Sequence, residues 1–212
     1  MGVRQSYNLW SSQYDTNENK TRDLEARALR EILSRISFTH CLELGCGTGK
    51  NTEWLYQNAN GVLAVDLSEE MIGKAKEKIN SGAVEFLLAD ISKAWAFPIK
   101  QFDLITFSLV LEHIEDLNHI FHEASRTIKD GGHLYVGELH PFKQYAGSKA
   151  RFETPEGLHV VECYTHHISD FISAATNNGF TLERLYEYFD EDDKQGVPRL
   201  LTLLFRKKVR SF

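Results

Sequence analysis

The 212-residue sequence predicts a single α/β domain with a mostly parallel sheet and helices on both faces of that sheet. Apolar runs of strand length alternate with segments of helical periodicity along most of the chain. Strands separated by helices imply right-handed crossovers and parallel pairing. The last third changes rhythm, because two long runs at residues 181–189 and 199–206 flank an acidic turn. This pattern predicts an antiparallel hairpin that closes one edge of the sheet.

The expected elements follow in order along the chain. Residues 22–36 carry apolar side chains at helical spacing with charges on the opposite face, which predicts a helix. Ser68 stands at an N-cap position before a helix that runs towards Asn80. Residues 129–132 are expected to form the turn before the fifth strand. The remaining predictions are a strand that closes at Glu43, strands over residues 62–66, 84–90, 102–109 and 133–139, a helix that begins at residue 50, and helices over residues 117–128 and 169–178.

Three glycines follow the first predicted strand at alternating positions: Gly45, Gly47 and Gly49. Glycine is required where the backbone adopts positive φ or lies directly against a ligand, since a Cβ atom would collide there. The helix that begins just beyond presents unpaired N–H groups and a favourable dipole to a bound anion. This turn is therefore expected to be the entrance to a cofactor site of the nucleotide type.

The spacing of this turn discriminates among such cofactors. A dinucleotide fingerprint would need glycine where the chain has Lys50. A phosphate-binding loop would need glycine and a hydroxyl residue where the chain has Leu44 and Asn51. The pattern that remains is an acidic residue followed by three alternating glycines. Taken alone, it leaves open a glycine turn without any cofactor.

Acidic side chains end three of the predicted strands. Ligands of open α/β sheets bind at the carboxyl ends of the central strands, so Glu43, Asp66 and Asp90 are expected to meet at one site. Ser108 and Leu109 close the fourth strand at the same edge. An acid at the end of the second strand is well placed to accept hydrogen bonds from both ribose hydroxyls. We therefore expect Asp66 to contact a ribose; the alternative is an acid that only marks a strand end.

Five ordered segments within residues 7–139 resemble motifs of the class I S-adenosylmethionine-dependent methyltransferases. They are the glycine turn, D-x-S-x-x-M from Asp66, A-D-I at residues 89–91, F-D followed by L-x-H at residues 102–113, and R-x-I-K-x-G-G at residues 126–132. The resemblance is to small members that consist of the cofactor domain alone. It implies a Rossmann-like, doubly wound, seven-stranded sheet with strand order 3-2-1-4-5-7-6. It also implies S-adenosylmethionine as cofactor and S-adenosylhomocysteine as product.

The resemblance implies a role for each matching residue. The acid of the second strand would bind ribose, Leu67 and Met71 would flank the adenine, and Asp90 with the N–H of Ile91 would contact the adenine ring. Trp95 stands where the family often has leucine, so it is either a core residue or an adenine contact. The full set of expected cofactor residues is Tyr14, Glu43, Gly45, Cys46, Gly47, Gly49, Asp66, Leu67, Met71, Asp90, Ile91, Ser108, Leu109 and His113.

Residues 1–20 of the predicted single domain (1–212) resemble the flexible lid of that family. Tyr7, Trp10 and Tyr14 recur at near-helical spacing, which is otherwise typical of a helix packed on a core. The surrounding residues are polar, so we expect Tyr14 to reach the methionine carboxylate and Trp10 to shield the sulfonium, since aromatic faces attract cations. Residues 143–167 match no element of the sheet and are expected to be an insertion over the acceptor site. The expected acceptor residues are Tyr7, Trp10, His140, Tyr145 and Tyr164.

Methyl transfer from a sulfonium mainly requires alignment of donor and acceptor, which is worth up to about 7–11 kcal/mol. A general base matters only where the acceptor must lose a proton. His140, one residue past the fifth strand, is the expected base because histidine titrates near neutral pH. The alternative is a histidine that only hydrogen-bonds the turn, and His113 is a weaker candidate for the base. No metal is expected, since the pairs His119–His122 and His166–His167 join no third ligand of a known motif.

Composition and charge narrow the function classes. The net charge of −6 argues against a broad nucleic-acid footprint. No run approaches the about 20 apolar residues that cross a bilayer, and no apolar signal core follows Met1. The three cysteines form no paired framework, so a cytoplasmic setting is expected. We expect a monomer or homodimer that methylates an oxygen or nitrogen atom of a small molecule. The alternatives are methylation of RNA or protein, or cofactor binding without catalysis.

Overall fold

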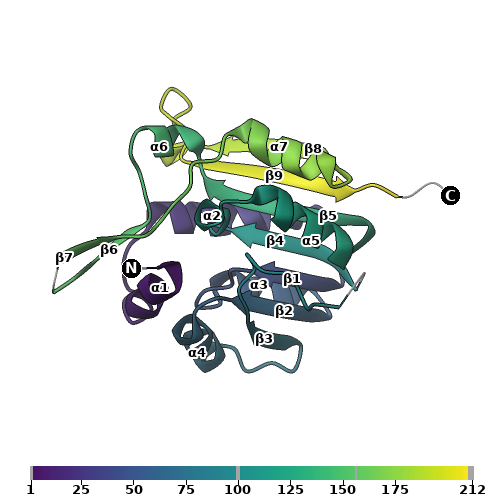
Figure 1. Ribbon diagram of the computed structural model, residues 1–212, viewed down its shortest axis with the longest axis horizontal. Helices are drawn as coiled ribbons and strands as arrows, with labels where there is room; N and C mark the ends of the chain where they lie inside the picture. The colour runs from purple at the N-terminus through teal and green to yellow at the C-terminus, as the bar shows by residue number, and fades with distance from the viewer. Residues whose placement is uncertain (1, 99–100, 156, 210–212) are drawn as a thin grey trace.

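Seven strands form one central sheet in the computed structural model, which describes residues 2–98, 101–155 and 157–209 (Figure 1). Met1, residues 99–100, Glu156 and residues 210–212, which belong to the predicted domain, lid and insertion, lie outside the described residues. The strands are ordered β3 (Val84–Leu88), β2 (Gly61–Asp66), β1 (His40–Leu44), β4 (Phe102–Ser108), β5 (Ile128–Leu139), β9 (Leu200–Lys207) and β8 (Phe180–Tyr188). Numbered among themselves in chain order, they give the predicted order 3-2-1-4-5-7-6.

Pairing within the sheet is parallel from β3 to β5 and antiparallel where β9 joins β5 and β8. The predicted C-terminal hairpin is therefore confirmed. The parallel strands from β3 to β5 run in one direction, so their carboxyl ends lie together at one edge of the molecule (Figure 1). That edge is where ligands of such sheets bind.

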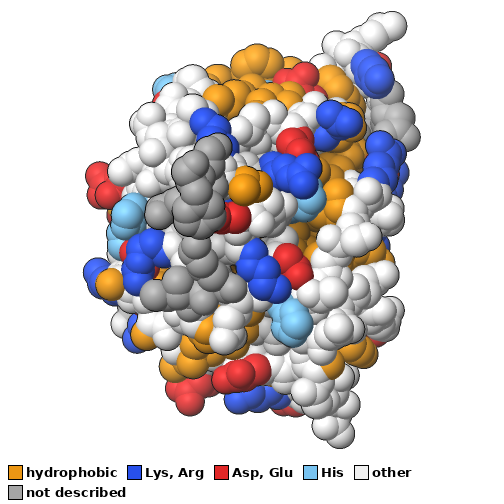
Figure 2. All heavy atoms as spheres, turned by 90° about the vertical axis from the view of Figure 1, so that its right-hand side faces the viewer, with side chains coloured by type: hydrophobic (Ala, Val, Ile, Leu, Met, Phe, Trp, Pro, Cys, Tyr) orange, Lys and Arg blue, Asp and Glu red, His pale blue; other side chains and the backbone are white. Residues whose placement is uncertain are grey.

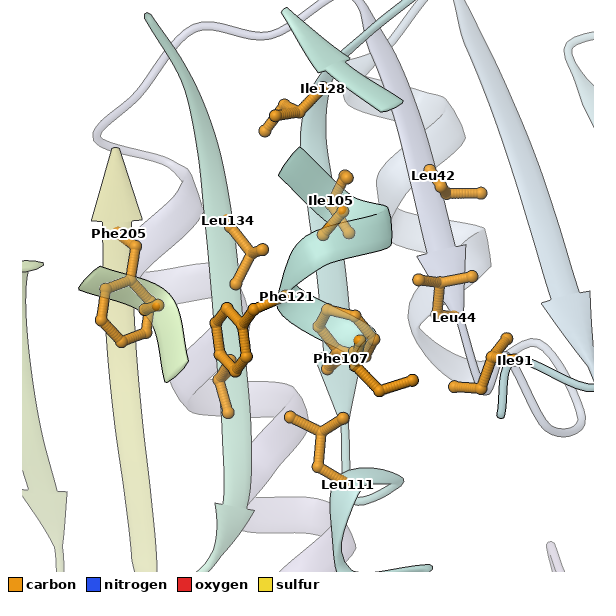
Figure 3. Close-up of a cluster of buried hydrophobic side chains, with 14 of the residues drawn as sticks. Leu42, Leu44, Ile91, Ile105, Phe107, Leu111, Phe121, Ile128, Leu134 and Phe205 are labelled. Atoms are coloured by element: carbon orange, nitrogen blue, oxygen red, sulfur yellow. The ribbon is translucent and has the colours of Figure 1, made fainter. Parts of the chain in front are cut away.

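Helices cover both faces of the sheet. On one face, α2 (Lys20–Leu33) and α3 (Lys50–Asn58) contribute buried side chains to a cluster with β1, β2, β4 and β5. On the other, α5 (Leu117–Thr127) and α7 (Ile168–Asn177) pack against the same sheet. Figure 3 shows Phe121 of α5 beside Phe107 of β4 and Leu134 of β5. Because both faces are covered, the central strands are buried along most of their length.

Polar side chains set where several helices begin. Asn19 caps α2 by accepting a hydrogen bond from the N–H of Arg22 at 3.0 Å. The predicted cap Ser68 accepts one from the N–H of Met71 at 3.1 Å and starts α4 (Glu69–Lys78). Caps of this kind stabilise a helix by about 1 kcal/mol. They fix the helix ends that face the ligand edge of the sheet.

The fifth strand differs from the prediction, because β5 begins at Ile128 and includes the residues expected to form a turn. The pairing register with β4 shifts between Phe102 and Leu104, whose partners are Ile128 and His133. Gly131 has a φ of 78° inside this irregular stretch. The glycines therefore accommodate a bulge within a strand, where the sequence suggested a break. The third strand also ends earlier than expected, at Leu88.

A separate group of elements lies over the carboxyl edge of the sheet (Figure 1). It comprises α1 (Val3–Trp10), α6 (Pro141–Tyr145) and a two-stranded hairpin of β6 (Arg151–Thr154) and β7 (Gly157–Val160). The hairpin and α6 fall within or against the predicted insertion at residues 143–167. Figure 2 views the opposite side, where basic and acidic side chains are intermixed. Within the described residues, every helix is too short or too polar to cross a lipid bilayer.

Candidate functional site

A cavity of about 380 Å³, here called the first cavity, opens at the carboxyl ends of β1, β2 and β4. Tyr7, predicted to contact the acceptor, lines it together with most of the residues predicted to contact the cofactor. The latter are Tyr14, Gly45, Gly47, Asp66, Leu67, Asp90, Ile91, Ser108, Leu109 and His113. The structure thus brings together residues as far apart in the sequence as Tyr7 and His113, which are 106 positions apart.

The turn between β1 and α3 has a backbone that glycine alone adopts easily. Gly45, Gly47 and Gly49 have φ values of 78°, 53° and 83°. A Cβ atom on Gly45 would lie 2.6 Å from Cγ2 of Val110, so the chain approaches too closely there for any side chain. A Cβ atom on Gly47 would meet only the ring of Tyr14, at 4.0 Å, because that glycine borders the cavity.

Asp66 joins the glycine turn to the end of β2. Its Oδ2 accepts a hydrogen bond from the N–H of Gly47 at 2.8 Å, and its Oδ1 accepts one from the N–H of Ser68 at 2.8 Å. Burial raises the pKa of this carboxyl, while the backbone donors oppose the shift. Asp90 lines the same cavity, and its Oδ1 accepts hydrogen bonds from the N–H and the hydroxyl of Ser92.

Four predicted cofactor residues lie behind the cavity wall instead: Glu43, Cys46, Gly49 and Met71. Glu43 is buried and accepts a hydrogen bond from the hydroxyl of Thr52 at 2.5 Å, which fastens β1 to α3; burial raises its pKa to about 8. Cys46 packs in the core, Met71 is fully buried and Gly49 caps α3. These residues support the cavity from the core side. Their place in the motif therefore reflects a requirement of the fold as well as contact with a ligand.

Leu109 marks a strained point at the end of β4. Its φ of 56° is unusual for a residue with a branched side chain, and its N–H donates to the carbonyl of Gly137 at 2.8 Å. The following loop is held by Glu138, whose Oε1 accepts from the N–H groups of Val110 at 3.0 Å and Leu111 at 2.8 Å. Oε2 of Glu138 is buried with no hydrogen-bond partner among the described residues, and burial raises the pKa of this carboxyl to about 8.

The N-terminal segment is tied to the site at two places. Asn8 Oδ1 accepts a hydrogen bond from the hydroxyl of Ser68 at 2.6 Å. Asp15 accepts one from the hydroxyl of Thr48 at 2.6 Å and also pairs with Lys78. The segment therefore crosses both the glycine turn and the start of α4. This position agrees with the lid predicted for residues 1–20, whose role as a lid stays a prediction.

Tyr7 and His113 form a hydrogen-bonded pair at the wall of the first cavity. The hydroxyl of Tyr7 lies 2.7 Å from Nε2 of His113, and Nδ1 of the same ring lies 2.7 Å from the carbonyl of Glu162. A carbonyl only accepts, so Nδ1 carries a hydrogen atom and the neutral ring accepts the Tyr7 proton at Nε2. Burial raises the pKa of Tyr7 well above its ordinary value, so the phenol stays protonated.

Aromatic rings connect the N-terminal segment to the hairpin. Trp10 is buried, stacks on Phe152 with ring centroids 5.1 Å apart and meets the edge of Tyr14 at 5.1 Å. The guanidinium carbon of Arg22 lies 4.2 Å from the centroid of the Tyr14 ring. Nη1 of Arg22 is buried and has no hydrogen-bond partner among the described residues. Trp10 is thus part of a small satellite core, and an unpaired guanidinium nitrogen lies next to Tyr14.

A second cavity of about 350 Å³ adjoins the first. Tyr7, Tyr14 and Leu109 line both cavities and form their shared wall. The rest of the second cavity is contributed by Trp10, residues 18–22, Glu112, Leu139, residues 148–151 and Arg199. Of the five residues predicted to contact the acceptor, Tyr7 and Trp10 line this cavity.

His140 occupies a different environment from the one expected of a base. It is fully buried and lines neither cavity. Its Nε2 lies 2.9 Å from Oε1 of Glu187, while Nδ1 accepts a hydrogen bond from the N–H of Phe142 at 3.2 Å. Burial lowers its pKa. These contacts favour the alternative interpretation, a histidine that hydrogen-bonds the turn at the start of α6.

Tyr145 and Tyr164 also lie outside both cavities. The hydroxyl of Tyr145 lies 2.6 Å from Nδ1 of His167, and its ring is about half exposed. Tyr164 contributes its backbone N–H to the carbonyl of Glu112 at 2.7 Å. Trp95 is a core residue whose indole N–H donates to the carbonyl of Ile91 at 2.9 Å. The acceptor roles predicted for both tyrosines stay predictions.

One cluster has the chemistry of metal ligands. Atoms of Glu112, His113 and Cys163 lie within 4.8 Å of one another. Both ring nitrogens of His113 are already engaged, by Tyr7 and a carbonyl group. Burial, with the nearby Glu112 carboxylate, raises the pKa of Cys163 to about 12, which keeps its thiol protonated. The cluster is therefore a poor metal site as it stands, because metals bind the thiolate.

Sequence reasoning missed several residues of the two cavities. Val110 and Ile114 line the first cavity from the loop after β4, and Arg22 and Glu112 line the second. Glu112 lies inside the predicted L-x-H segment, so its place next to His113 was a usable signal. Arg22 offered only its position at the start of a helix, two residues beyond the predicted lid.

Comparison with known proteins extends these observations. A family model described as a methyltransferase domain matches residues 42–136. A malonyl-[acyl-carrier protein] O-methyltransferase of Hamiltonella defensa is 34% identical over 113 residues, covering 52% of this chain and 42% of the relative. A demethylmenaquinone methyltransferase of Leptospira interrogans is 31% identical over 152 residues, covering 65% and 61%. The chain spans about half the length of these curated relatives.

Solved structures share the architecture. An S-adenosylmethionine-dependent methyltransferase from Mesorhizobium loti has a TM-score of 0.73 at 23% identity, over 85% of this chain and 96% of that chain. At this identity the likeness concerns the fold. The matched domain contains the glycine turn, Asp66, Asp90 and His113 that line the first cavity. The methyltransferase-domain model thus matches the segment of the chain that carries these cavity residues, and the solved structure shares the fold over 85% of the chain.

Proposed function

We propose that the protein binds S-adenosylmethionine in the first cavity and transfers its methyl group to an oxygen or nitrogen atom of a small molecule in the second. The observation that carries this proposal is the wall of Tyr7, Tyr14 and Leu109 that the two cavities share. A methyl group passing between two bound molecules needs such adjacent sites, because alignment is the main requirement of the reaction.

The residues of the first cavity fit the cofactor in charge and shape. The open side of Gly47 admits a ligand against the backbone, and Asp66 offers carboxylate oxygens to ribose hydroxyls. Asp90 is available to the adenine amino group. The unpaired Nη1 of Arg22 suits the methionine carboxylate beside Tyr14. When bound, the cofactor supplies a methyl group activated by a sulfonium.

Tyr7 and His113 provide a route for a proton from the acceptor. Tyr7 lines both cavities, and its proton is held by Nε2 of His113. Its oxygen would accept a hydrogen bond from a hydroxyl or amine of the acceptor. The ring at His113 is fixed by the carbonyl of Glu162, so it is oriented to take that proton. This pair replaces His140 as the proposed base.

Calorimetric titration with S-adenosylhomocysteine tests the first half of the proposal. Asp66→Asn removes a carboxylate that would accept hydrogen bonds from ribose. The affinity of this variant for S-adenosylhomocysteine should therefore be at least about tenfold below that of the wild type. Glu85→Gln, the same change at an exposed residue on β3, is the matched control and should keep the affinity of the wild type. Equal affinities in all three proteins would refute the assignment of Asp66.

Mass-spectrometric screening of small hydroxyl and amine compounds for a gain of one methyl group tests the second half. A product that depends on S-adenosylmethionine supports the proposed transfer. Binding of the cofactor with no product across a broad panel would instead favour a protein that binds the cofactor without catalysis. Products formed only on RNA or protein would favour the macromolecular alternative.

A further inference from the structure

We propose that the second cavity recognises an anionic group of the methyl acceptor, a carboxylate or a phosphate, remote from the atom that is methylated. This inference rests on the proposed function, because it names the class of molecule that the cavity would hold. It comes from the charges around the cavity and from the way they are distributed along it.

Cationic side chains outnumber acidic ones in the lining of the second cavity, although the whole chain has a net charge of −6. Among the described residues that line the cavity, five are cationic and two are acidic. The cations are Lys20, Arg22, Lys149, Arg151 and Arg199. They come from three segments of the chain: the start of α2, the approach to the hairpin and the residue before β9. Clustering from separate segments in an acidic chain indicates a site for negative charge.

Three of these cations are available to the acceptor. Arg22 lies over the ring of Tyr14 and is already proposed to bind the methionine carboxylate of the cofactor. Arg199 is already engaged, since its guanidinium pairs with Asp190 and donates to the hydroxyl of Thr21 at 3.1 Å. Lys20, Lys149 and Arg151 form no ion pair with another residue that the structure describes. All three are exposed at the rim, so their charges can meet a ligand without prior loss of a partner.

Helix α2, which begins at the second cavity, adds a second source of positive potential. Asn19, Lys20, Thr21 and Arg22 line the cavity, and they are the cap and first turn of the 14-residue helix α2. The side chain of Asn19 already accepts from the N–H of Arg22, while the other N–H groups of a first helical turn lack intrahelical acceptors and favour an anion. Helix terminus and side-chain cations therefore act on one region of the cavity.

The acidic residues give the ligand a direction. Glu112 is buried, lines the second cavity, and its Oε1 lies 3.9 Å from Nε2 of His113. It therefore lies by the Tyr7–His113 pair, where it would repel an anion but accept a hydrogen bond from a hydroxyl or amine. Glu18, the other acid, is exposed. The anionic end of the acceptor thus points to Lys20, Lys149 and Arg151, and the nucleophile points to the shared wall.

The test uses inorganic phosphate and propionate as probes of the full-length protein saturated with S-adenosylhomocysteine. Dissociation constants are measured by NMR titration at constant ionic strength, because exposed charges are screened by salt. Lys149→Gln/Arg151→Gln removes two rim cations and should weaken binding of the preferred anion at least about fivefold. Lys76→Gln/Arg184→Gln, the same pair of changes outside both cavities, should leave it unchanged.

Each outcome decides the matter. Tighter phosphate binding that is lost in the rim variant assigns a phosphate group, and tighter propionate binding assigns a carboxylate. An anion affinity that is undetectable, or that changes by less than about twofold, or equally in both variants, overturns the inference alone if S-adenosylhomocysteine still binds. Failure of S-adenosylhomocysteine to bind overturns the proposed function, and the inference with it.

Discussion

At the scale of single residues, two histidines near the site differ in what their ring nitrogens can still do. The ring of His113 borders the first cavity, and its neutral form holds the proton of Tyr7. His140 is buried, with one nitrogen at Glu187 and the other at a backbone N–H. Both histidines follow strands at the ligand edge of the sheet, so only their contacts separate a base from a structural residue.

This contrast predicts opposite effects of two substitutions. Tyr7→Phe removes the hydroxyl that would relay the acceptor proton, so kcat should fall by about a hundredfold, with little change in affinity for S-adenosylhomocysteine. His140→Gln should keep kcat within about twofold but lower the unfolding free energy by about 1–2 kcal/mol through its lost hydrogen bonds. Steady-state kinetics and thermal unfolding measure both quantities.

A normal kcat in Tyr7→Phe would remove Tyr7 from the proton route. His113→Gln then separates the two members of the pair, since a ring that acts alone would still be needed. A large loss of kcat in His140→Gln with unchanged thermal stability would restore His140 as the base.

At the scale of elements, the buried end of β5 holds the loop after β4. Glu138 does this with one oxygen, while the other lies buried without a partner that the described residues supply. A carboxyl in this position ionises with difficulty, and its pKa is raised to about 8 from an ordinary 4.5. The loop carries Leu109 and Val110, which line the first cavity, so Glu138 positions a part of the cavity lining.

The raised pKa predicts a pH dependence of stability. Between about pH 4.5 and pH 8 the unfolded chain releases a proton that folded Glu138 keeps, so this group makes the protein less stable as the pH rises. Glu138→Gln cannot ionise, and its amide oxygen can still accept from Val110 and Leu111. The variant should gain stability relative to wild type across that window, by at most about 1.4 kcal/mol per pH unit.

Denaturant unfolding of both proteins at several pH values measures this difference. Glu43 is shifted in the same direction, to about 8, so the variant should retain part of the wild-type slope. Glu43→Gln, at the end of β1 just before the glycine turn, is the matched comparison. A constant difference between wild type and Glu138→Gln from pH 5 to pH 8 would mean that Glu138 is ionised in the folded protein.

The elements also indicate how far the sequence determines the site. Gly45, Gly47 and Asp66 could be placed because their roles depend on short spacing and on the end of a strand, which are local properties. Glu43 and Met71 share those motifs but lie behind the wall. Which face of a strand end or helix start meets the ligand depends on the crossing of other segments, which no local pattern encodes.

At the scale of the whole molecule, the sheet with its two helical layers is predictable from alternating periodicities. The elements over its carboxyl edge, α1, α6 and the β6–β7 hairpin, here called the cap, are not predictable in this way. The two large cores contain nearly all of the buried sheet residues. The cap has its own small core of Trp10, Phe152 and Val161. Residues 143–167 gave no periodic signal because β6 and β7 are four residues each and one side of their hairpin is exposed. Short strands of this kind are defined by their pairing with a partner strand, and sequence spacing alone does not identify that partner.

This division into a sheet and a cap predicts how the molecule opens. The cap buries few apolar side chains of its own and is tied to the sheet domain by a few polar links, such as Asn8 to Ser68 and Asp15 to Thr48. Local opening should therefore cost less free energy in α1 than in β1 or β4. Hydrogen exchange followed by mass spectrometry should show faster exchange in peptides covering residues 2–16 than in peptides covering β4.

Binding of S-adenosylhomocysteine should slow exchange in those N-terminal peptides, because Tyr7 and Tyr14 line the first cavity. Peptides from β9, which lines neither cavity, provide the internal control and should not change. Trp10→Ala removes the ring that stacks on Phe152, so it should speed exchange in α1 and in β6 together while β4 stays protected. If the two segments of the cap responded separately, α1 and the hairpin would be independent elements, and only α1 would qualify as the lid over the cofactor.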